Sequence, residues 1–469
     1  MSEKRLSRRD FLRASALVAG GAVLAACQSA APTTTQPAAP TAQAPAAKSQ
    51  TQATQAPAKA ALSGKIVFMC DTINEGHQKA RDGWVQRFQT ANSGVTVEHQ
   101  PVPNTDYPTK LQTLFAAGTP PDVFRYLQEN VPIVTAAAKN LNLKLDSYVT
   151  RDQYDLSGFR PDAVNLYRWE GALYALPRDY GNQNIYYNID MFQKEGLKTP
   201  PTDWEDKTWT FQAFLDAAQK LTKKSGNRVE QYGFVLNRGL RPWSSWVYNN
   251  GGALVNKDDK GMAKSIALTE PAAVEALQFM QDLIYKHGVA PTPDVEKESN
   301  TAQLFSTGRV GMIMTNPSDV NLYRSVTAFK WDVAPLPLGK ATRRGTGGGG
   351  TGWAIAASTK LPDVAWEFLK SIASTQAELD EVAVGATTPS RTAIATGKEF
   401  LDPNKPPANS KSFAQAQEYV VRDPVHARWP EILQRIVAPT MDQLWTNAKN
   451  AADVAKAIKD GADPIFAQG

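Results

Sequence analysis

Three tryptophans stand beside small and amide-bearing residues, in segments that the sequence predicts to be loops or strand edges: Trp243, Trp246 and Trp353. A flat indole ring can cover the apolar C–H face of a sugar, while Asn, Asp, Gln and Arg side chains bind the sugar hydroxyls. These residues therefore predict a site for a polyhydroxylated ligand. Core packing is the alternative for each of them, and it is favoured for Trp84 and Trp366, which lie on apolar helix faces.

The sequence contains no local motif for a metal site or for a serine hydrolase. The four histidines are scattered and form no Cys/His cluster, so we expect neither a metal site nor a cofactor. No G-x-S-x-G sequence is present for a serine hydrolase. The paired carboxylates of a glycoside hydrolase have no fixed local spacing, so the sequence neither excludes nor identifies them. No catalytic residue is predicted.

A glycine run gives a formal match to another motif. Gly345, Gly347 and Gly350 have the G-x-G-x-x-G spacing of dinucleotide-binding turns. That motif must follow a strand and begin a helix, whereas here a basic segment comes before the run and a strand-like segment, 353–358, comes after it. We therefore expect a flexible loop that leads into a strand, and no NAD or flavin binding.

The N-terminal stretch from Ser7 to Cys27 predicts export. The Arg8-Arg9 pair precedes a thirteen-residue apolar run from Ala14 to Ala26, shorter than the roughly 20 residues of a membrane-spanning helix. Its last four residues, 24–27, resemble the bacterial lipoprotein box, which is cleaved before a cysteine that receives lipid. We expect a twin-arginine lipoprotein signal peptide over residues 1–27, lipidation of Cys27, and a mature protein anchored on the extracytoplasmic face of the cell membrane.

Residues 28–62 are rich in Ala, Pro, Thr and Gln and predict a disordered tether. Removing residues 1–27 from the 469 leaves 442, more than one hydrophobic core commonly holds, so two lobes are expected. The same removal takes +3 from the formal charge of +5, and without a long Lys/Arg run no nucleic-acid partner is expected. Cys70 then stands alone, and we expect it to be buried at a strand end.

Strands and helices alternate along the folded part. Apolar runs predict strands at 65–70, 95–98 and 122–126, with helices at 77–90 and 107–117 between them. This alternation predicts an α/β sheet, whose functional groups collect at the carboxyl ends of its strands. Candidates there are residues 71–75 and Tyr126 with Gln128.

Later segments repeat the alternation after a polar, glycine-containing stretch from Arg178 to Asn184, which we expect to be a hinge. Helices are predicted at 210–223, 270–287 and 363–373, and the remaining strands are predicted at these segments: 173–177, 185–188, 232–236, 310–315 and 331–334.

Several short segments together resemble family 1 extracellular solute-binding proteins, the group that includes maltose-binding protein and serves ABC importers. The resemblance covers residues 63–469 and is carried by the order and spacing of six segments: Ala117-Gly118-Thr119-Pro120-Pro121-Asp122-Val123, Tyr187-Asn188-Ile189-Asp190-Met191-Phe192, Asn249-Asn250-Gly251-Gly252, Phe305-Ser306-Thr307-Gly308-Arg309-Val310-Gly311-Met312, Ala334-Pro335-Leu336-Pro337 and Ala365-Trp366-Glu367-Phe368-Leu369-Lys370.

The resemblance implies an α/β, two-lobed periplasmic-binding-protein-like fold of type II, with a hinge and a ligand cleft between the lobes. It implies chain crossings near 178–184 and 336–346. Lobe 1 is expected to hold 63–180 and 340–395, and lobe 2 to hold 181–339 and 396–469. Many relatives carry a stacking tryptophan where this chain has Asn316-Pro317-Ser318, so that subsite is expected to lack its ring.

The expected function is that of a non-catalytic, monomeric receptor that captures a sugar, an oligosaccharide in particular, and delivers it to an ABC permease. Eight residues are predicted to bind the ligand: Tyr126, Asp179, Trp243, Trp246, Asn249, Asn316, Trp353 and Arg391. Two alternatives stay open. The same fold could bind a glycerol phosphodiester in a cationic cleft or a polyamine in an anionic one, or the chain could be a secreted carbohydrate-active enzyme with two facing carboxylates.

Overall fold

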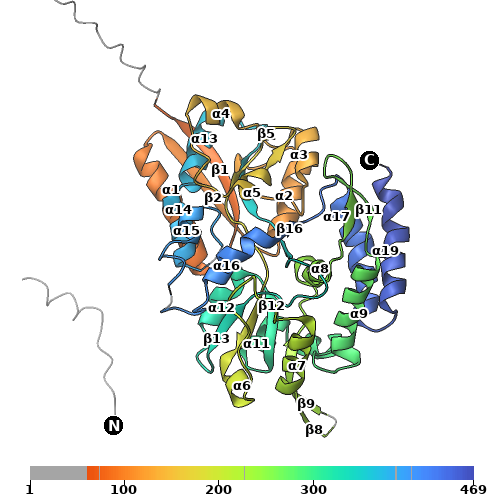
Figure 1. Cartoon of the computed structure of the whole chain (residues 1–469). Helices are drawn as coiled ribbons and strands as arrows, with labels where there is room; N and C mark the ends of the chain where they lie inside the picture. The colour runs from red at the N-terminus through yellow and green to blue at the C-terminus, as the bar shows by residue number, and fades with distance from the viewer. Residues whose placement is uncertain (1–60, 73, 227, 386–387, 403, 469) are drawn as a thin grey trace, which may run out of the picture. The chain divides into compact units, whose positions relative to one another are not determined.

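Two five-stranded sheets organise the chain. The computed structural model describes residues 61–72, 74–226, 228–385, 388–402 and 404–468, within the compact unit Ala60–Gly469. The first sheet has the order β2-β1-β3-β15-β6 and defines lobe 1; the second has the order β13-β7-β12-β9-β8 and defines lobe 2 (Figure 1). The strands of the two sheets are β1 Gly64–Thr72, β2 Val95–Pro103, β3 Val123–Leu127, β6 Leu176–Pro177, β7 Asn184–Asn188, β8 Lys223–Ser225, β9 Arg228–Val235, β12 Val310–Thr315, β13 Trp331–Ala334 and β15 Thr351–Ile355.

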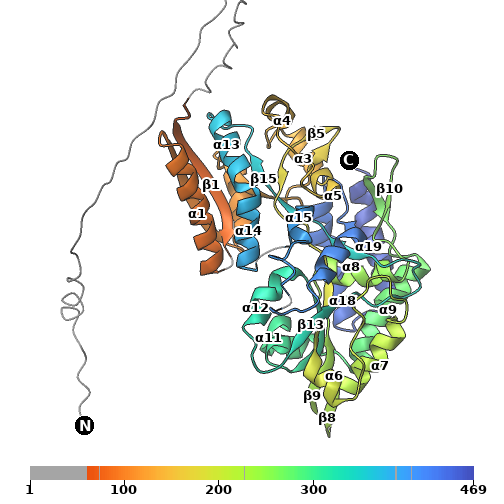
Figure 2. The same ribbon diagram turned by 60° about the vertical axis from the view of Figure 1, so that its left-hand side comes forward.

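Lobe 1 packs helices against a mixed sheet. β1 pairs in parallel with β2 and β3, and β15 pairs antiparallel with β3 and β6. Helices α1, α13 and α14 lie along the sheet on one flank (Figure 2). The helices of the first sheet's segments are α1 Glu75–Ala91, α2 Tyr107–Ala116, α3 Ile133–Ala138, α4 Asp146–Arg151, α5 Pro161–Asn165, α13 Pro362–Ile372, α14 Thr375–Ala383 and α15 Thr392–Ala395, with the hairpin β4 Arg168–Trp169 and β5 Ala172–Leu173.

The core of lobe 1 is aromatic. Asn74 caps α1 by accepting a hydrogen bond from the His77 backbone N–H at 2.9 Å, which fixes where the helix starts. Trp84 on α1 meets Trp353 on β15 edge-on at 5.9 Å between ring centroids, and Phe68 on β1 meets the same ring at 5.6 Å. These contacts bury the apolar runs that predicted the strands and helix, and the predicted elements of this region are confirmed.

Lobe 2 holds the C-terminal helices as well as its own sheet. Its other elements are α6 Ile189–Lys194, α7 Phe211–Leu221, α8 Leu240–Asn249, β10 Val255–Lys257, β11 Ala263–Ile266, α9 Pro271–Tyr285, α10 Pro293–Glu298, α11 Thr301–Ser306, the 3₁₀ turn Pro317–Asp319, α12 Val320–Arg324, α16 Lys411–Ala416, the 3₁₀ turn Gln417–Tyr419, α17 Trp429–Ile432, the π-helical turn Leu433–Val437, α18 Ala438–Trp445 and α19 Ala451–Phe466. α9 and α19 pack side by side (Figure 1).

The expectation that Trp243 and Trp246 lie in a loop is wrong. Both belong to α8, where Trp243, Trp246 and Val247 recur at three- and four-residue spacing and form a buried face. The ring of Trp246 packs against Phe214 and Phe234, at 5.1 and 5.8 Å between centroids. Trp353 likewise lies in an interior strand, β15, between β3 and β6.

The chain crosses between the sheets from β6 to β7 and returns between β13 and β15. On the return the chain forms β14, Thr346–Gly348. This strand pairs in parallel with β16, Val420–Arg422, which we call the linking strand. Gly349 bridges Gly181 of the first crossing, with a hydrogen bond of 2.6 Å from the Gly181 N–H to the Gly349 carbonyl.

The glycine run is therefore not the flexible loop that we expected. A Cβ atom at Gly348 would meet the carbonyl oxygen of Gly181, and one at Gly350 would meet that of Asp179. Glycine is needed because backbones approach each other closely where the chain crosses between the lobes.

Within the described ranges, no helix has the length and apolar character needed to cross a membrane. The signal peptide, the lipidated Cys27 and nearly all of the 28–62 tether lie outside the described residues. They stay predictions, as do the lobe boundaries at 180/181, 339/340 and 395/396.

Candidate functional site

Two adjacent cavities lie between the lobes. The smaller, about 410 Å³, is called the polar cavity; the larger, about 900 Å³, is called the basic cavity. Both are lined by Arg241, Gly349, Gly350 and Asp423, so the two cavities meet at these residues. Each also takes lining residues from both lobes and from the crossing segments, so the two cavities form one cleft between the lobes.

The polar cavity begins at the ends of the lobe 1 strands. Asp71 near the end of β1 and Arg125 in β3 line one side, and Asn237 and Asn316, which follow β9 and β12, line the lobe 2 side. This agrees with the rule that functional groups gather beyond the carboxyl ends of strands. No aromatic side chain is among the residues that line this cavity.

A buried ionic network supports the lobe 1 side of the polar cavity. Asp71 lies 2.6 Å from Arg125 and 3.0 Å from Arg81. Glu381 on α14 lies 3.1 Å from Arg81 and 2.5 Å from Arg178. The network ties β1, β3, α1, α14 and the first crossing together through charge pairs that are largely buried.

The pKa values of the two buried carboxyls follow from these partners. Burial raises the pKa of Asp71, but Arg125 and Arg81 outweigh burial and hold it well below its ordinary value. Burial also raises the pKa of Glu381, but Arg178 and Arg81 outweigh burial and hold that pKa below its ordinary value. The pKa of His77, which lies 3.5 Å from Glu381, is lowered by burial. Asp71 and Glu381 are therefore ionised at neutral pH, and His77 is neutral.

Asp179 faces the polar cavity but is already engaged. Its carboxylate accepts hydrogen bonds from the Thr351 N–H at 2.6 Å and the Thr351 hydroxyl at 2.8 Å, and it pairs with Arg178 at 2.5 Å. These bonds join the first crossing to β15, so Asp179 holds the crossing as well as lining the cavity.

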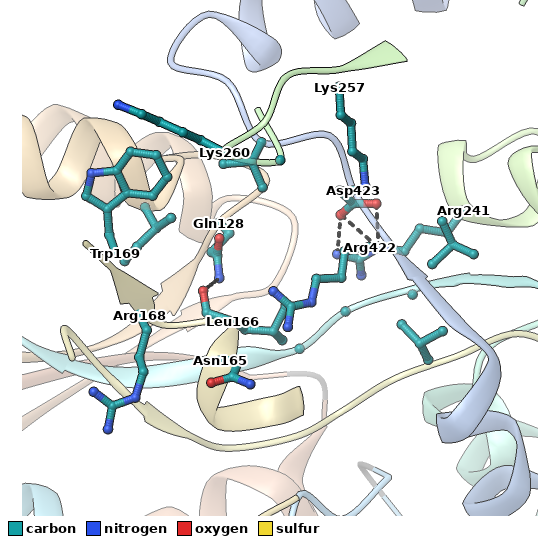
Figure 3. A pocket seen from close by; sticks show the side chains of 18 of the residues that line it. Gln128, Asn165, Leu166, Arg168, Trp169, Arg241, Lys257, Lys260, Arg422 and Asp423 are labelled. Atoms are coloured by element: carbon teal, nitrogen blue, oxygen red, sulfur yellow. Dashed lines mark hydrogen bonds and ion pairs between the residues drawn. The ribbon is translucent and has the colours of Figure 1, made fainter. Parts of the chain in front are cut away.

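The basic cavity lies between two hairpins (Figure 3). Lobe 1 contributes Arg168 and Trp169 of β4, and lobe 2 contributes Lys257 and Lys260 of the β10–β11 hairpin. Arg422 of β16 extends between them (Figure 3). With Arg241 this makes five basic side chains, against the two carboxylates of Glu170 and Asp423.

An ion pair marks the boundary of the two cavities. Arg241 on α8 donates from Nη2 to Asp423 Oδ2 at 2.6 Å and from Nε to the same oxygen at 3.1 Å (Figure 3). Its Nη2 also lies 3.4 Å from Glu129, which follows β3 in lobe 1. Burial lowers the pKa of Arg241, but the two carboxylates outweigh burial and raise it. Arg241 therefore stays charged and connects lobe 2 with lobe 1 across the cleft.

Of the eight predicted ligand-binding residues, the structure brings two together on a cavity wall: Asp179 and Asn316 both line the polar cavity. Tyr126, Trp243, Trp246 and Trp353 instead lie in the hydrophobic cores. Tyr126 is 2% exposed, and its hydroxyl donates to the Val131 carbonyl at 2.7 Å. That Asp179 and Asn316 contact a ligand stays a prediction. The four aromatic rings are buried and present no surface to the cleft.

The other two predicted residues, Asn249 and Arg391, make contacts that hold parts of the fold together. Asn249 is buried and donates from its amide to the Ser245 and Gly345 carbonyls, both at 2.6 Å, which attaches α8 to the second crossing. Arg391 donates to the Ala373 carbonyl at 2.7 Å and stacks over the Phe159 ring at 3.8 Å. Neither lines either cavity.

Several cavity residues were missed by the sequence reasoning. Trp169 precedes a Glu-Gly turn, Lys257 and Lys260 lie around another turn, and Asp423 precedes a proline. Turn residues of this kind were a visible signal of hairpins. Their convergence on one cavity depends on the packing of the lobes, which no local pattern encodes.

Cys70 lies next to a histidine and an aspartate, an arrangement that resembles a catalytic Cys-His-Asp group. Its sulfur lies 3.2 Å from His99 Nε2, and His99 Nδ1 lies 2.6 Å from Asp82. However, the thiol is fully buried, and burial raises its pKa to about 12. A protonated thiol with no exposed surface is a poor nucleophile, so the prediction of a buried cysteine at a strand end is confirmed.

Comparison with known proteins agrees with this architecture. Solved structures with the same fold include a substrate-binding protein of Listeria monocytogenes in complex with cycloalternan (TM-score 0.75, 23% identity, covering 86% of this chain and 99% of that one). A second is a receptor of Streptomyces glaucescens solved without ligand and with acarbose (TM-score 0.73, 22% identity, 87% and 99%). At these identities the likeness establishes the fold, and the predicted two-lobed α/β fold is confirmed.

The sequence relatives match this chain over only part of their length. A binding protein of Brucella abortus is 27% identical over 293 residues, which are 60% of this chain, and the match spans 65% of that relative's length. A lactose-binding protein of Rhizobium radiobacter is 24% identical over 336 residues, 69% of this chain and 73% of the relative. Residues 83–408 match the family model described as bacterial extracellular solute-binding protein, and this chain belongs to that family.

Proposed function

We propose that this protein captures a carbohydrate, an oligosaccharide in particular, in the cleft between its lobes and delivers it to the membrane subunits of an ABC importer. The observation that carries the proposal is the pair of cavities lined by both lobes and by the crossings. The lining supplies amides, carboxylates and guanidinium groups suited to sugar hydroxyls. Relatives named for lactose and arabinooligosaccharide binding support the ligand class.

Ligand capture would act by closing the lobes. A ligand that touches Asn316 of lobe 2 and the Asp71–Arg125 pair of lobe 1 at once makes its full set of contacts only when the lobes are together. Binding would therefore shift the population toward the closed state, the form that a permease would recognise. The segments that cross between the lobes would carry the bending.

In the same proposal the mature protein is a monomer held on the outer face of the membrane by lipid on Cys27. The 28–62 tether would keep it near its permease while leaving it free to turn. The route of export is proposed from the Arg8-Arg9 pair alone.

Catalysis is the alternative of a different class, and the carboxylates of the cleft do not favour it. Of the five carboxylates that line the two cavities, all but Glu170 are paired with an arginine: Asp71, Glu129, Asp179 and Asp423. A glycoside hydrolase needs one carboxyl that stays protonated near neutral pH, whereas the pKa of Asp71 is held low. A polyamine is also disfavoured, because the larger cavity carries five basic side chains and two carboxylates.

The proposal is tested by thermal unfolding of the purified full chain with neutral oligosaccharides, glycerol phosphodiesters and polyamines. A sugar that binds the folded state should raise the melting temperature in a concentration-dependent way. Stabilisation by a polyamine or phosphodiester, without stabilisation by any carbohydrate, would assign the cleft to another solute. Release of a shorter glycan during incubation would indicate an enzyme.

A further inference from the structure

We propose that the oligosaccharide is anionic, and that the basic cavity holds its acidic sugar unit, with the sugar ring near Trp169 and the carboxylate among Lys257, Lys260 and Arg422. This inference rests on the proposed carbohydrate function and narrows it to oligosaccharides that contain a uronic acid.

The charges of the basic cavity are not neutralised within the protein. Asp423, one of its two carboxylates, is already bound by Arg241 through three hydrogen bonds. Lys257 and Lys260 form no ion pair with a carboxylate of the described residues, and Arg422 donates to a neutral acceptor, the Asp162 carbonyl, at 3.5 Å. Glu170 alone is left to face these three cations, so the cavity has an excess of positive charge that an anionic ligand would balance.

The lysines are presented by a turn of defined shape. Between β10 and β11, the Asp258 carboxylate accepts hydrogen bonds from the Lys260 N–H at 2.9 Å and the Met262 N–H at 2.8 Å. The Asp258 N–H in turn donates to the Met262 carbonyl at 2.9 Å. These bonds fix the backbone of the turn that carries Lys260, and both lysines line the cavity with exposed side chains that can reach a ligand.

Lobe 1 supplies a different kind of surface. Trp169 is partly exposed at the cavity and belongs to β4, and the Lys260 side chain extends toward the Trp169 side of the cavity (Figure 3). Leu166 and Ile133 add apolar surface on the same side. An indole ring and apolar neighbours suit the C–H face of a sugar ring better than they suit a free inorganic anion. A partly exposed ring with cations around it fits a sugar that itself carries the charge.

The size of the site favours an oligosaccharide over a small phosphate ester. At about 900 Å³ the cavity is large enough for several sugar units and not only for one small ester. Two ammonium groups and one planar guanidinium supply donors from both the lobe 2 hairpin and β16 to the two oxygens of a carboxylate. An acidic unit here would join elements of both lobes and so favour closure.

The test uses the purified full chain with two trisaccharides of equal length, a trigalacturonate and a neutral galactotriose, and with a galactose phosphate ester as the phosphate probe. Calorimetric titration at low salt should give the trigalacturonate an affinity at least about tenfold above that of the neutral trisaccharide, and added salt should reduce this difference. The double variant Lys257→Gln/Lys260→Gln should lose about tenfold affinity for the acidic ligand and less than about twofold for the neutral one.

Lys264→Gln is the matched control, because Lys264 is an exposed lysine of the same hairpin that does not line the cavity. Its affinities should equal those of the unaltered chain, and thermal unfolding should give all variants the same midpoint. Equal or tighter binding of the neutral trisaccharide would overturn the inference and leave the proposed function standing. Preference for the phosphate ester would overturn it in favour of a phosphorylated solute. Binding of no carbohydrate at all would instead remove the proposed function.

Discussion

Arg241 and Asp423 form a forked ion pair, 2.6 Å at its shortest, at the place where the two interlobe cavities meet. Arg241 comes from α8 of lobe 2, and Asp423 directly follows the linking strand β16. Glu129 of lobe 1 lies 3.4 Å from the same guanidinium. One arginine therefore contacts both lobes and the linking segment, and its position couples the cleft walls to each other.

Replacing Arg241 should weaken ligand binding by about tenfold, because the variant leaves the Asp423 carboxylate without its partner and removes the contact across the lobes. Arg241→Ala and Arg241→Lys are compared by calorimetric titration with the best carbohydrate ligand. Lysine keeps the charge and loses the fork, so its loss should be the smaller of the two. Unchanged affinity in Arg241→Ala would separate this ion pair from ligand binding.

The buried network predicts a large stability effect at Glu381. Glu381→Gln removes the carboxylate that Arg81 and Arg178 share and leaves Arg81 with Asp71 and Arg178 with Asp179 alone. Breaking a buried ionic network at one partner costs up to about 3 to 5 kcal/mol. Glu75→Gln is the control, because Glu75 forms an exposed i,i+4 pair with Lys79 that is worth less than about 0.5 kcal/mol. Urea unfolding measures both. Similar unfolding midpoints in the two variants would mean that the network adds little to stability.

Acid should destabilise the protein in a specific window. The pKa values of Asp71 and Glu381 are lowered in the folded state, so at low pH the unfolded state binds protons more readily than the folded state does. The stability that the two carboxylates contribute is present above about pH 4, their unfolded pKa, and is lost as the pH falls further. Urea midpoints measured from pH 6 to pH 3 should fall more steeply for the unaltered chain than for Asp71→Asn/Glu381→Gln. Parallel pH profiles would exclude these two groups as the source.

Cys70 should be unreactive in the folded protein. Its thiol is buried and its pKa is raised to about 12, so little thiolate forms at neutral pH and no reagent reaches it. In the full chain with Cys27→Ala, an aromatic disulfide reagent should label no thiol in native buffer and one thiol in denaturant. Rapid labelling of the native protein would mean that β1 opens readily.

Sequence patterns predicted the elements well because each strand and helix carries its own apolar period. The runs before Cys70 and around Val310–Thr315 are strands, and the spacing of Trp84 and Phe88 marks the buried face of α1. The same periodicity was present at Trp243, Trp246 and Val247, where the neighbouring amides and glycines suggested a loop instead. Helical spacing was the stronger signal.

The candidate site was predictable only where its residues directly follow strands. Asp179 and Asn316 come after β6 and β12, so their place near the cleft follows from the α/β pattern. Trp169, Lys257 and Arg422 come from three segments far apart in the chain. They converge because two hairpins and a linking strand pack around one space, and this depends on contacts between the lobes.

The central claim is that the interlobe cleft binds a carbohydrate, and calorimetric titration of the purified full chain with neutral and uronic-acid oligosaccharides tests it most directly. We predict saturable binding of one oligosaccharide per chain that Arg241→Ala weakens by about tenfold. Saturable binding of a carbohydrate that is unaffected by Arg241→Ala and by Lys257→Gln/Lys260→Gln would place the site elsewhere, and the absence of binding by any oligosaccharide would contradict the claim itself.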